Sequence, residues 1–216
     1  MSTDDKYSQS KTFDAMSTRG LTAKREQVRE LELRADGDAI ERLLDCLRDE
    51  SWYLRDLAEQ ALTRLGRRGA DALVPLLRQG LWYTRAGASR ILGRIGYGDA
   101  VPALFELTRD SNHSVGSAAL DALVEIGRQR GAVRLAHALH RMPPDARQQR
   151  MDEIQSRDAM LGERLRRLMR SELMAVDDVS ALDDDSAAVR ASEEGVEWEV
   201  LTGPPSPRSP HDGGDG

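Results

Sequence analysis

The sequence predicts an all-α fold: an α-solenoid of about three helical hairpins, with capping helices and disordered termini. Two observations predict this fold. Aromatic residues make up only 4% of the 216 residues. A core of Leu, Ile, Val and Ala suits packed helices better than sheets, in which aromatic and β-branched residues dominate. In addition, three segments of the chain align with one another without gaps, and each carries apolar residues at helical spacing.

The three aligned segments begin at Trp52, Trp82 and His113 and close on glycines that lie 30 and 31 residues apart, namely Gly66, Gly96 and Gly127. The apolar residues recur every three or four positions, which is the period of one buried helix face. They are Leu54, Ala58, Ala61, Leu62 and Leu65, then Ala88, Ile91, Leu92 and Ile95, then Val115, Ala119, Ala122, Leu123 and Ile126. We expect each helix to end at its glycine in a left-handed conformation.

Shorter apolar runs lie between these helices, over residues 38–47, 71–77 and 99–107. Each opens with an aspartate, which we expect to cap a helix by accepting backbone N–H bonds. Glu41 lies three residues after Asp38, which fits a capping box. A fourth run is predicted from Ala132 to Leu139. The unit is therefore a helix–turn–helix of about 30 residues, which buries its apolar face only when copies stack.

The flanking sequences complete a division into four regions. Residues 1–20 are polar and aperiodic and are predicted to be disordered. The solenoid covers residues 21–142 and starts with a capping helix whose Val28, Leu31 and Leu33 pack on the first repeat. Residues 143–175 are predicted to cap the last repeat, with Gly162 as a possible break into two helices; a projecting helix for self-association is the alternative. Residues 176–216 are predicted to be an acidic disordered tail.

Charge is distributed unevenly along the chain. Residues 177–216 carry 11 acidic residues and 2 arginines, a net charge of −9, so the rest carries +3 of the total of −6. Within this tail, residues 195–202 alternate apolar and acidic side chains, which is a strand period. Val196, Trp198 and Val200 are either the anchors of a short linear motif or a segment that folds back onto the solenoid.

Two stretches of the chain resemble the HEAT-like repeats first named from phycobilisome bilin lyases. One is the run from Asp49 to Arg55, followed by Ala61-Leu62 and Leu65-Gly66, and the other is the run from Ile95 to Leu104. The resemblance spans roughly residues 38–139. It implies a right-handed superhelix whose concave face is lined by the second helix of each pair, which we take to be the shorter one.

The same resemblance assigns roles to recurrent positions. It implies that Arg55 and Arg85 bond across repeats and hold the stack, and that this ladder breaks where Gly116 replaces the arginine. It also implies that the Trp-Tyr pairs beginning at Trp52 and Trp82 pack the loops between units. A row of aromatic side chains that binds a partner is the alternative for these pairs.

The resemblance and the charge together favour a non-enzymatic scaffold or adaptor whose concave face binds another, acidic protein. The candidate contact residues lie on the shorter helices and are Arg42, Arg48, Arg78, Arg109, Arg134 and Arg141, with Asp45 and Glu106 among them. A corollary hypothesis is that the acidic tail, anchored by Trp198, occupies this groove in cis and competes with partners.

A nucleic-acid-binding solenoid is disfavoured because phosphate-binding surfaces are strongly basic. A chromophore-handling role, like that of a bilin lyase, rests on the family name alone. No catalytic residue, cofactor site or metal site is predicted. His137 and His140 share one helix face but have no further ligands nearby in sequence, and Cys46 fits a small core residue.

The sequence also bears on location. No segment approaches the ~18 apolar residues of a membrane-spanning helix. The first residues lack a basic region followed by an apolar core, so we expect no secretory signal. The single cysteine, Cys46, excludes an internal disulfide and fits a reducing compartment. We expect a cytoplasmic protein, and the sequence predicts no particular oligomeric state.

Overall fold

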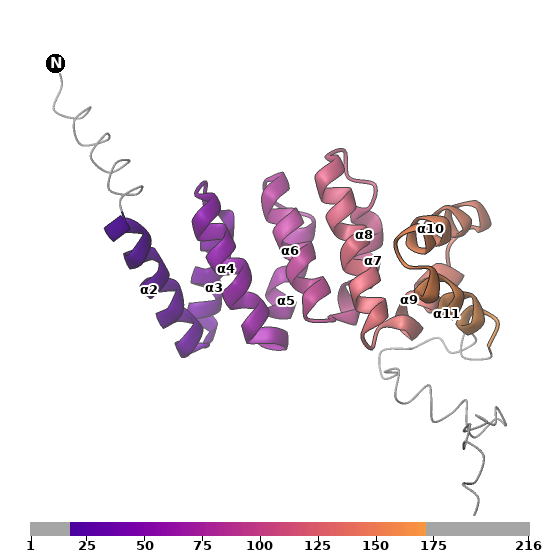
Figure 1. Cartoon of the computed structure of the whole chain (residues 1–216), viewed down its shortest axis with the longest axis horizontal. Coiled ribbons are helices and arrows are strands. Elements are labelled where there is room, and N and C mark those ends of the chain that lie inside the picture. Colours follow the sequence, from indigo (N-terminus) through magenta and orange to yellow (C-terminus); the bar gives the residue numbers. More distant parts are fainter. Residues whose placement is uncertain (1–17, 172–216) are drawn as a thin grey trace, which may run out of the picture.

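The computed structural model describes residues 18–171, and every element of secondary structure within them is a helix (Figure 1). The predicted all-α solenoid is therefore confirmed. The α-helices are α2 (Thr18–Arg34), α3 (Gly37–Arg48), α4 (Trp52–Leu65), α5 (Ala70–Leu73), α6 (Trp82–Arg94), α7 (Val101–Leu107), α8 (His113–Arg128), α9 (Ala132–His140), α10 (Pro144–Arg157) and α11 (Ala159–Met169). Three single-turn 3₁₀ helices join them, namely η1 (Gly66–Gly69), η2 (Val74–Leu77) and η3 (Gly98–Ala100). Disorder was predicted for residues 1–20; residues 18–20 belong to α2, so this part of the prediction is wrong, and residues 1–17 lie outside the described residues. The acidic tail and its motif at Val196, Trp198 and Val200 also lie outside them.

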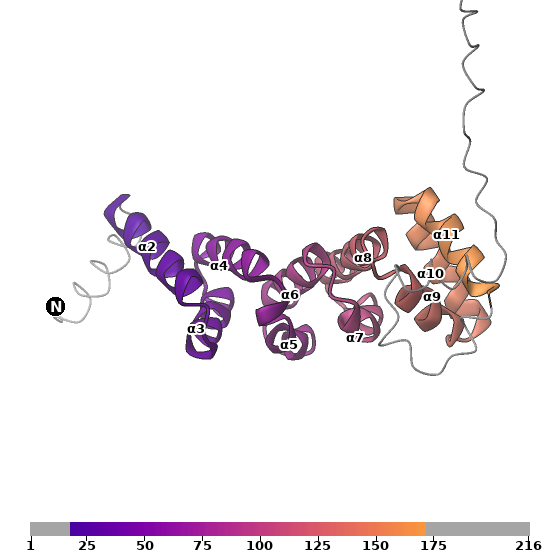
Figure 2. The same ribbon diagram turned by 90° about the horizontal axis from the view of Figure 1, so that it is seen from below.

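The helices form two rows. The longer helices α4, α6 and α8 lie in one row, and α3, α5 with η2, and α7 lie in the other (Figures 1 and 2). Each of α4, α6 and α8 begins where the sequence repeat begins, at Trp52, Trp82 and His113. The apolar stripes meet inside the stack, where Leu62, Leu92 and Leu123 are fully buried. A single hydrophobic core thus runs from α2 to α11.

The concave side of the stack is formed by the longer helices. Figure 2 shows α2, α4, α6, α8 and α11 along an arc that opens away from α3, α5 and α7. A Cβ atom added to Gly93 would lie 2.7 Å from the Cα atom of Ala122, so α6 and α8 approach closely. Small residues at a contact allow two helices to lie closer together. A stack of hairpins curves toward the row whose helices are more closely spaced, so that row forms the concave side. The prediction that the shorter helices line the concave face is therefore wrong.

Two of the three repeat glycines close their helices as predicted. Gly66 and Gly96 have φ values of 61° and 65°, in the left-handed region. Gly127 lies inside α8, which continues to Arg128. A Cβ atom there would lie 2.9 Å and 3.0 Å from the Cδ2 atoms of Leu161 and Leu135. The prediction of a left-handed cap at Gly127 is wrong, because this glycine makes room for the next helices instead.

The aspartates at the starts of the short runs do not cap helices as predicted. The N-cap of α3 is Asp36, whose carboxylate accepts a bond from the Ala39 N–H at 2.8 Å. Asp38 instead pairs with Arg34 at 2.9 Å, so the predicted capping box with Glu41 is wrong.

The two later aspartates join neighbouring hairpins. Asp71 accepts a hydrogen bond from the Tyr97 hydroxyl. Asp99 forms an ion pair with Arg134 on α9. These two aspartates lie at the exposed starts of short helices. They link one repeat to the next and do not cap their own helices.

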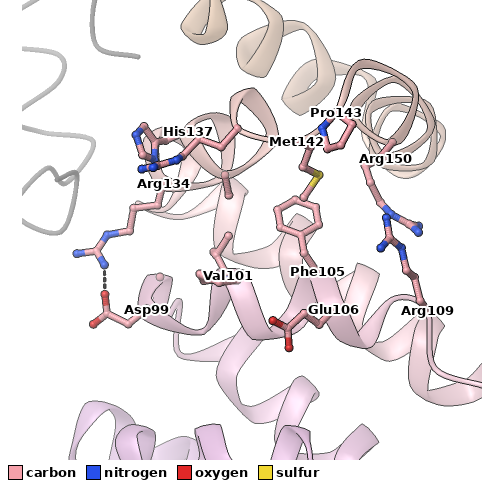
Figure 3. A pocket seen from close by; sticks show the side chains of 15 residues that line it. Asp99, Val101, Phe105, Glu106, Arg109, Arg134, His137, Met142, Pro143 and Arg150 are labelled. Carbon is pink, nitrogen blue, oxygen red and sulfur yellow. Dashed lines mark hydrogen bonds and ion pairs between the residues drawn. The ribbon is translucent and has the colours of Figure 1, made fainter. Parts of the chain in front are cut away.

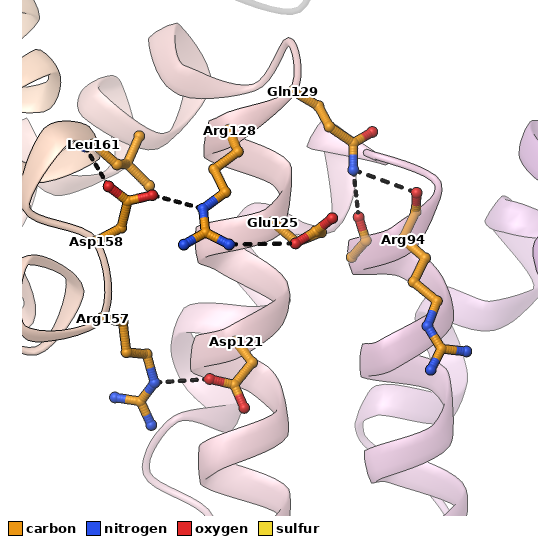
Figure 4. A network of polar contacts seen from close by, with 9 residues as sticks. Arg94, Asp121, Glu125, Arg128, Gln129, Arg157, Asp158 and Leu161 are labelled. Atoms are coloured by element: carbon orange, nitrogen blue, oxygen red, sulfur yellow. Dashed lines mark hydrogen bonds and ion pairs between the residues drawn. The ribbon is translucent and has the colours of Figure 1, made fainter.

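Polar contacts link successive long helices. Arg64 of α4 binds Glu32 of α2 at 2.7 Å, and Arg90 of α6 binds Glu59 of α4 at 3.0 Å. On the side of the last repeat, Figure 4 shows Arg128 bound to Asp158 and Arg157 bound to Asp121. Glu59 is buried. The other pairs are partly exposed and contribute about 0–1 kcal/mol each, so they set the register of the stack more than its stability.

The arginines at positions 55 and 85 make different contacts. Arg85 donates to Asp110, in the turn before α8, with its Nε atom at 2.8 Å. Arg55 donates to the backbone carbonyls of Asp49 and Glu50, and its guanidinium lies 4.1 Å from the ring centre of Tyr83 in the next repeat. Both arginines therefore contact the following unit, one through a carboxylate and one through an aromatic ring.

Both ends of the solenoid depart in detail from the predictions. In α2, Val28 and Leu31 are buried but Leu33 is 78% exposed, so its predicted packing is wrong. At the other end α10 and α11 pack on α8 and α9. The chain breaks between them at Asp158, which has extended dihedral angles and caps α11 through the Leu161 N–H at 2.9 Å. The predicted break at Gly162 is wrong, since Gly162 lies within α11.

Four carboxylates at the junctions of the stack have pKa values below their usual range, namely Glu32, Asp36, Asp110 and Asp158. At Asp158 the main cause of the lowered pKa is the hydrogen bond from the Leu161 N–H, followed by that from Arg128. A carboxylate whose pKa is lower in the folded state stabilises the fold above the unfolded pKa, about 4. This stabilisation is lost as the pH falls through the folded pKa.

The free energy of unfolding is therefore expected to fall as the pH is lowered from about 5 to about 2. Urea denaturation followed by circular dichroism at several pH values measures it. An Asp158→Asn variant keeps an oxygen that can cap α11 but cannot be protonated in this range, so it should lose less stability on acidification than the wild type. A fold that became more stable in acid would contradict this assignment.

Candidate binding pocket

The six predicted arginines lie on or directly after α3, η2, α7 and α9 and do not form one groove. Arg42 is exposed on α3. Arg48 pairs with Asp45 on its own helix at 2.8 Å, and Arg78 pairs with Glu106 at 2.8 Å. The other three predicted arginines come together around one pocket, and they are Arg109, Arg134 and Arg141.

This pocket lies between α7, α9 and α10 and has a volume of about 640 Å³. Its centre is apolar and is formed by Val101, Phe105 and Met142, with Pro143 beside them (Figure 3). The local sequence explains the opening. Pro144 is the first residue of α10, and a proline pair restricts the backbone and favours a new helix start. The chain thus turns away from α9 at this point and leaves the side of α7 uncovered.

Charged groups stand at the two ends of the pocket. At one end Arg134 is bound to Asp99, with His137 nearby (Figure 3). At the other end Arg109, which follows α7, and Arg150 of α10 point toward each other. Arg150 is only 6% exposed and pairs with Glu153. Two guanidinium groups that face one another repel, and an anion between them would remove the repulsion.

The guanidinium groups of Arg109 and Arg141 form no ion pair with any residue in the range 18–171. Of the other predicted arginines, Arg48, Arg78 and Arg134 each form one. Both residues are exposed at the rim of the pocket. An apolar centre with unpaired guanidinium groups at its rim suits a ligand that carries a carboxylate next to a large apolar group.

Sequence reasoning missed the apolar half of this site. Phe105, Met142 and Arg150 were not among the predicted contact residues. Pro143-Pro144 was visible as a helix boundary, but a boundary alone does not show that the next helix leaves a cavity. The excess of arginine on the shorter helices did predict part of the site, because three of the four arginines around the pocket were among the predicted residues.

The Trp-Tyr pairs also differ from expectation. Trp52 is 71% exposed and Trp82 is 49% exposed, so the expected packing of these rings between units is wrong. The tyrosines make the contacts instead. Tyr53 accepts a hydrogen bond from Arg25 at 3.2 Å, and Tyr83 donates to the Arg48 carbonyl at 3.4 Å. Each tryptophan meets its own tyrosine edge-on, with ring centres 5.9 Å and 5.7 Å apart.

Cys46 is buried, and burial raises the pKa of its thiol, which disfavours a reactive thiolate. His137 lines the pocket and His140 is exposed. Across residues 18–171 no group of three or more His, Cys, Asp or Glu side chains is arranged to hold a metal ion. None of the helices in that range combines the length and the apolar character needed to cross a membrane.

Comparison with known families agrees with the stacked hairpins. Residues 70–151 match a family model described as HEAT repeats, a range that runs from α5 into α10 and contains every residue that lines the pocket. A search of curated proteins returned no significant match. The match supports a HEAT-repeat protein, a fold class commonly used for protein interaction, and does not identify the bilin-lyase branch.

Proposed function

We propose that this chain is a non-enzymatic protein-interaction module and that its binding site is the pocket between α7, α9 and α10. The partner is a protein segment in which an acidic residue adjoins a large apolar side chain. The single observation that carries this proposal is that Arg109 and Arg141, at the rim of an apolar cavity, form no ion pair within residues 18–171. An acidic partner was expected from the sequence, and the pocket adds the need for an apolar anchor.

The pocket has the features of a recognition site. Its volume of about 640 Å³ lies within the ~300–1,000 Å³ of typical ligand pockets. Apolar anchors that fill a pocket supply most of the binding energy at protein interfaces, and surrounding charges supply orientation and rate. Phe105 and Met142 would contact the anchor, and Arg109 and Arg141 would receive its acidic neighbours. The buried single cysteine, Cys46, is compatible with action in the cytoplasm.

A fluorescein-labelled peptide tests this proposal. The test peptide Gly-Glu-Phe-Glu-Val-Gly carries one large apolar residue between two acidic residues, and a second peptide with lysines in place of the glutamates is its control. Fluorescence anisotropy with the full chain measures both. We expect saturable binding of the acidic peptide only, weakened by raising the salt from about 0.05 M to about 0.5 M, because screening shortens the range of charge interactions.

Two arginine variants locate the site. Arg109→Glu removes a charge-assisted contact and adds repulsion, so it should weaken binding of the test peptide about tenfold or more. Arg42→Glu changes the same charge on exposed α3, outside the pocket, and should leave the affinity within about twofold. Equal losses in the two variants would show that only the overall charge matters, and the assignment to this pocket would then be wrong.

A further inference from the structure

The chain carries a segment of the kind that the pocket would accept. Residues 196–201 read Val-Glu-Trp-Glu-Val-Leu, in which acidic and apolar side chains alternate. We infer that this segment binds in cis in the pocket between α7, α9 and α10 and excludes partner proteins until it is displaced. This inference rests on the proposed function and adds the occupant and the regulation of the same site.

The two faces of the segment match the two parts of the pocket. In an extended backbone, alternate side chains point to opposite sides and every second residue points to the same side. Val196, Trp198 and Val200 then form one apolar face, and Glu197 and Glu199 form the opposite, acidic face. Phe105, Val101 and Met142 offer an apolar centre to the first face, and the rim arginines receive the second.

Charge favours this occupant over other segments of the chain. The arginines around the pocket are Arg109, Arg134, Arg141 and Arg150, against two acidic residues, Asp99 and Glu106. Glu106 is already bound by Arg78, Asp99 by Arg134, and Arg150 by Glu153, which leaves Arg109 and Arg141 without an ion-pair partner among residues 18–171. The pocket is therefore cationic, whereas residues 177–216 carry −9. Opposite charges of this size also raise the rate of encounter.

The length of the chain permits the contact. The described residues end at Ser171, directly after α11, and α11 packs against α9, which forms one wall of the pocket. The 24 residues from 172 to 195 separate this point from Val196. A chain of that length spans up to about 80 Å, at roughly 3.3 Å a residue. Tethering of this kind gives local concentrations on the order of millimolar, so even a weak contact is populated.

Fluorescence of Trp198 in the full chain tests the inference. Trp52 and Trp82 are the other tryptophans of the chain and are both exposed. A Trp52→Phe, Trp82→Phe variant therefore leaves Trp198 as the sole indole with little change to the core. We expect blue-shifted emission and acrylamide quenching about threefold weaker than in the same variant carrying Arg109→Glu or Phe105→Ala. Adding Arg42→Glu instead should change neither signal.

The result must also be independent of concentration. If protection of Trp198 grew with protein concentration, the occupant would be a second copy of the chain and binding in cis would be wrong. Emission of a fully solvated indole in every variant would equally overturn the inference.

Binding of the test peptide separates this inference from the proposed function. Trp198→Ala in the full chain should bind the test peptide about tenfold more tightly than the wild type, because the internal competitor is lost. If both bind it equally and Arg109→Glu still weakens binding, the cis inference is wrong and the proposed function holds. If neither chain binds it, the proposed function is wrong and the inference falls with it.

Discussion

Replacing Gly93 with valine is expected to lower the free energy of unfolding by at least about 3 kcal/mol. Gly93 lies in α6 where that helix meets α8, and an added Cβ atom would lie 2.7 Å from the Cα atom and 2.9 Å from the Cβ atom of Ala122. Overpacking in a core costs about 1–3 kcal/mol when side chains can move, and here the obstacle is backbone. Valine gains only about 0.5 kcal/mol in helix propensity over glycine, so the clash dominates.

Gly37→Val is the matched control. Gly37 is the first residue of α3, and a Cβ atom added there has no neighbour within 4 Å. Its substitution should change the free energy of unfolding by less than about 0.5 kcal/mol. Urea denaturation of both variants measures the difference. If Gly93→Val were as stable as Gly37→Val, α6 and α8 would not be in close contact, and the curvature of the stack would need another cause.

Replacing Leu123 with alanine is expected to destabilise the fold by about 2–5 kcal/mol. Leu123 is fully buried, and it occupies the repeat position shared with Leu62 and Leu92. Truncation leaves a cavity between rigid helices that pack on both sides of it. For a domain whose total stability is about 5–15 kcal/mol, this is a large fraction.

Leu33→Ala provides the comparison for this prediction. Leu33 is 78% exposed on α2, so the same truncation removes little buried surface and should change the free energy of unfolding by less than about 0.5 kcal/mol. Thermal denaturation of the two variants under identical conditions compares them. Equal stabilities would mean that the repeat stripe does not form the core of the stack.

The period of the sequence was enough to predict the helices but not how closely they approach. The stripes through Leu62, Leu92 and Leu123 follow from local spacing, and so do the left-handed ends at Gly66 and Gly96. Which row of helices lies on the concave side depends instead on the distance between α6 and α8. That distance is set by the residues of the two helices that contact each other. A glycine in a stripe looks the same in sequence whether it ends a helix or makes room for a neighbour, and Gly127 shows the second case.

The candidate site was predictable only in part for a similar reason. The arginines at positions 109, 134 and 141 could be found by charge, because they lie on the same set of helices. The cavity beside Phe105 and Met142 opens where Pro143-Pro144 ends one helix and starts α10, and the sequence indicated this boundary but not the direction that α10 takes. The partners of Asp71 and Asp99 lie 26 and 35 residues away, so local capping rules misassigned both carboxylates.

The most direct test of the binding pocket is a titration of the full-length Trp198→Ala chain with the test peptide, followed by NMR of ¹³C-labelled methionine methyl groups. Met142 lies in the pocket, whereas Met160 is 82% exposed on α11 and serves as an internal reference. Substitution of each by leucine assigns its signal. We predict that the Met142 signal shifts until it saturates while the Met160 signal stays in place. Saturable binding of the peptide with an unmoved Met142 signal would contradict the assignment of this pocket.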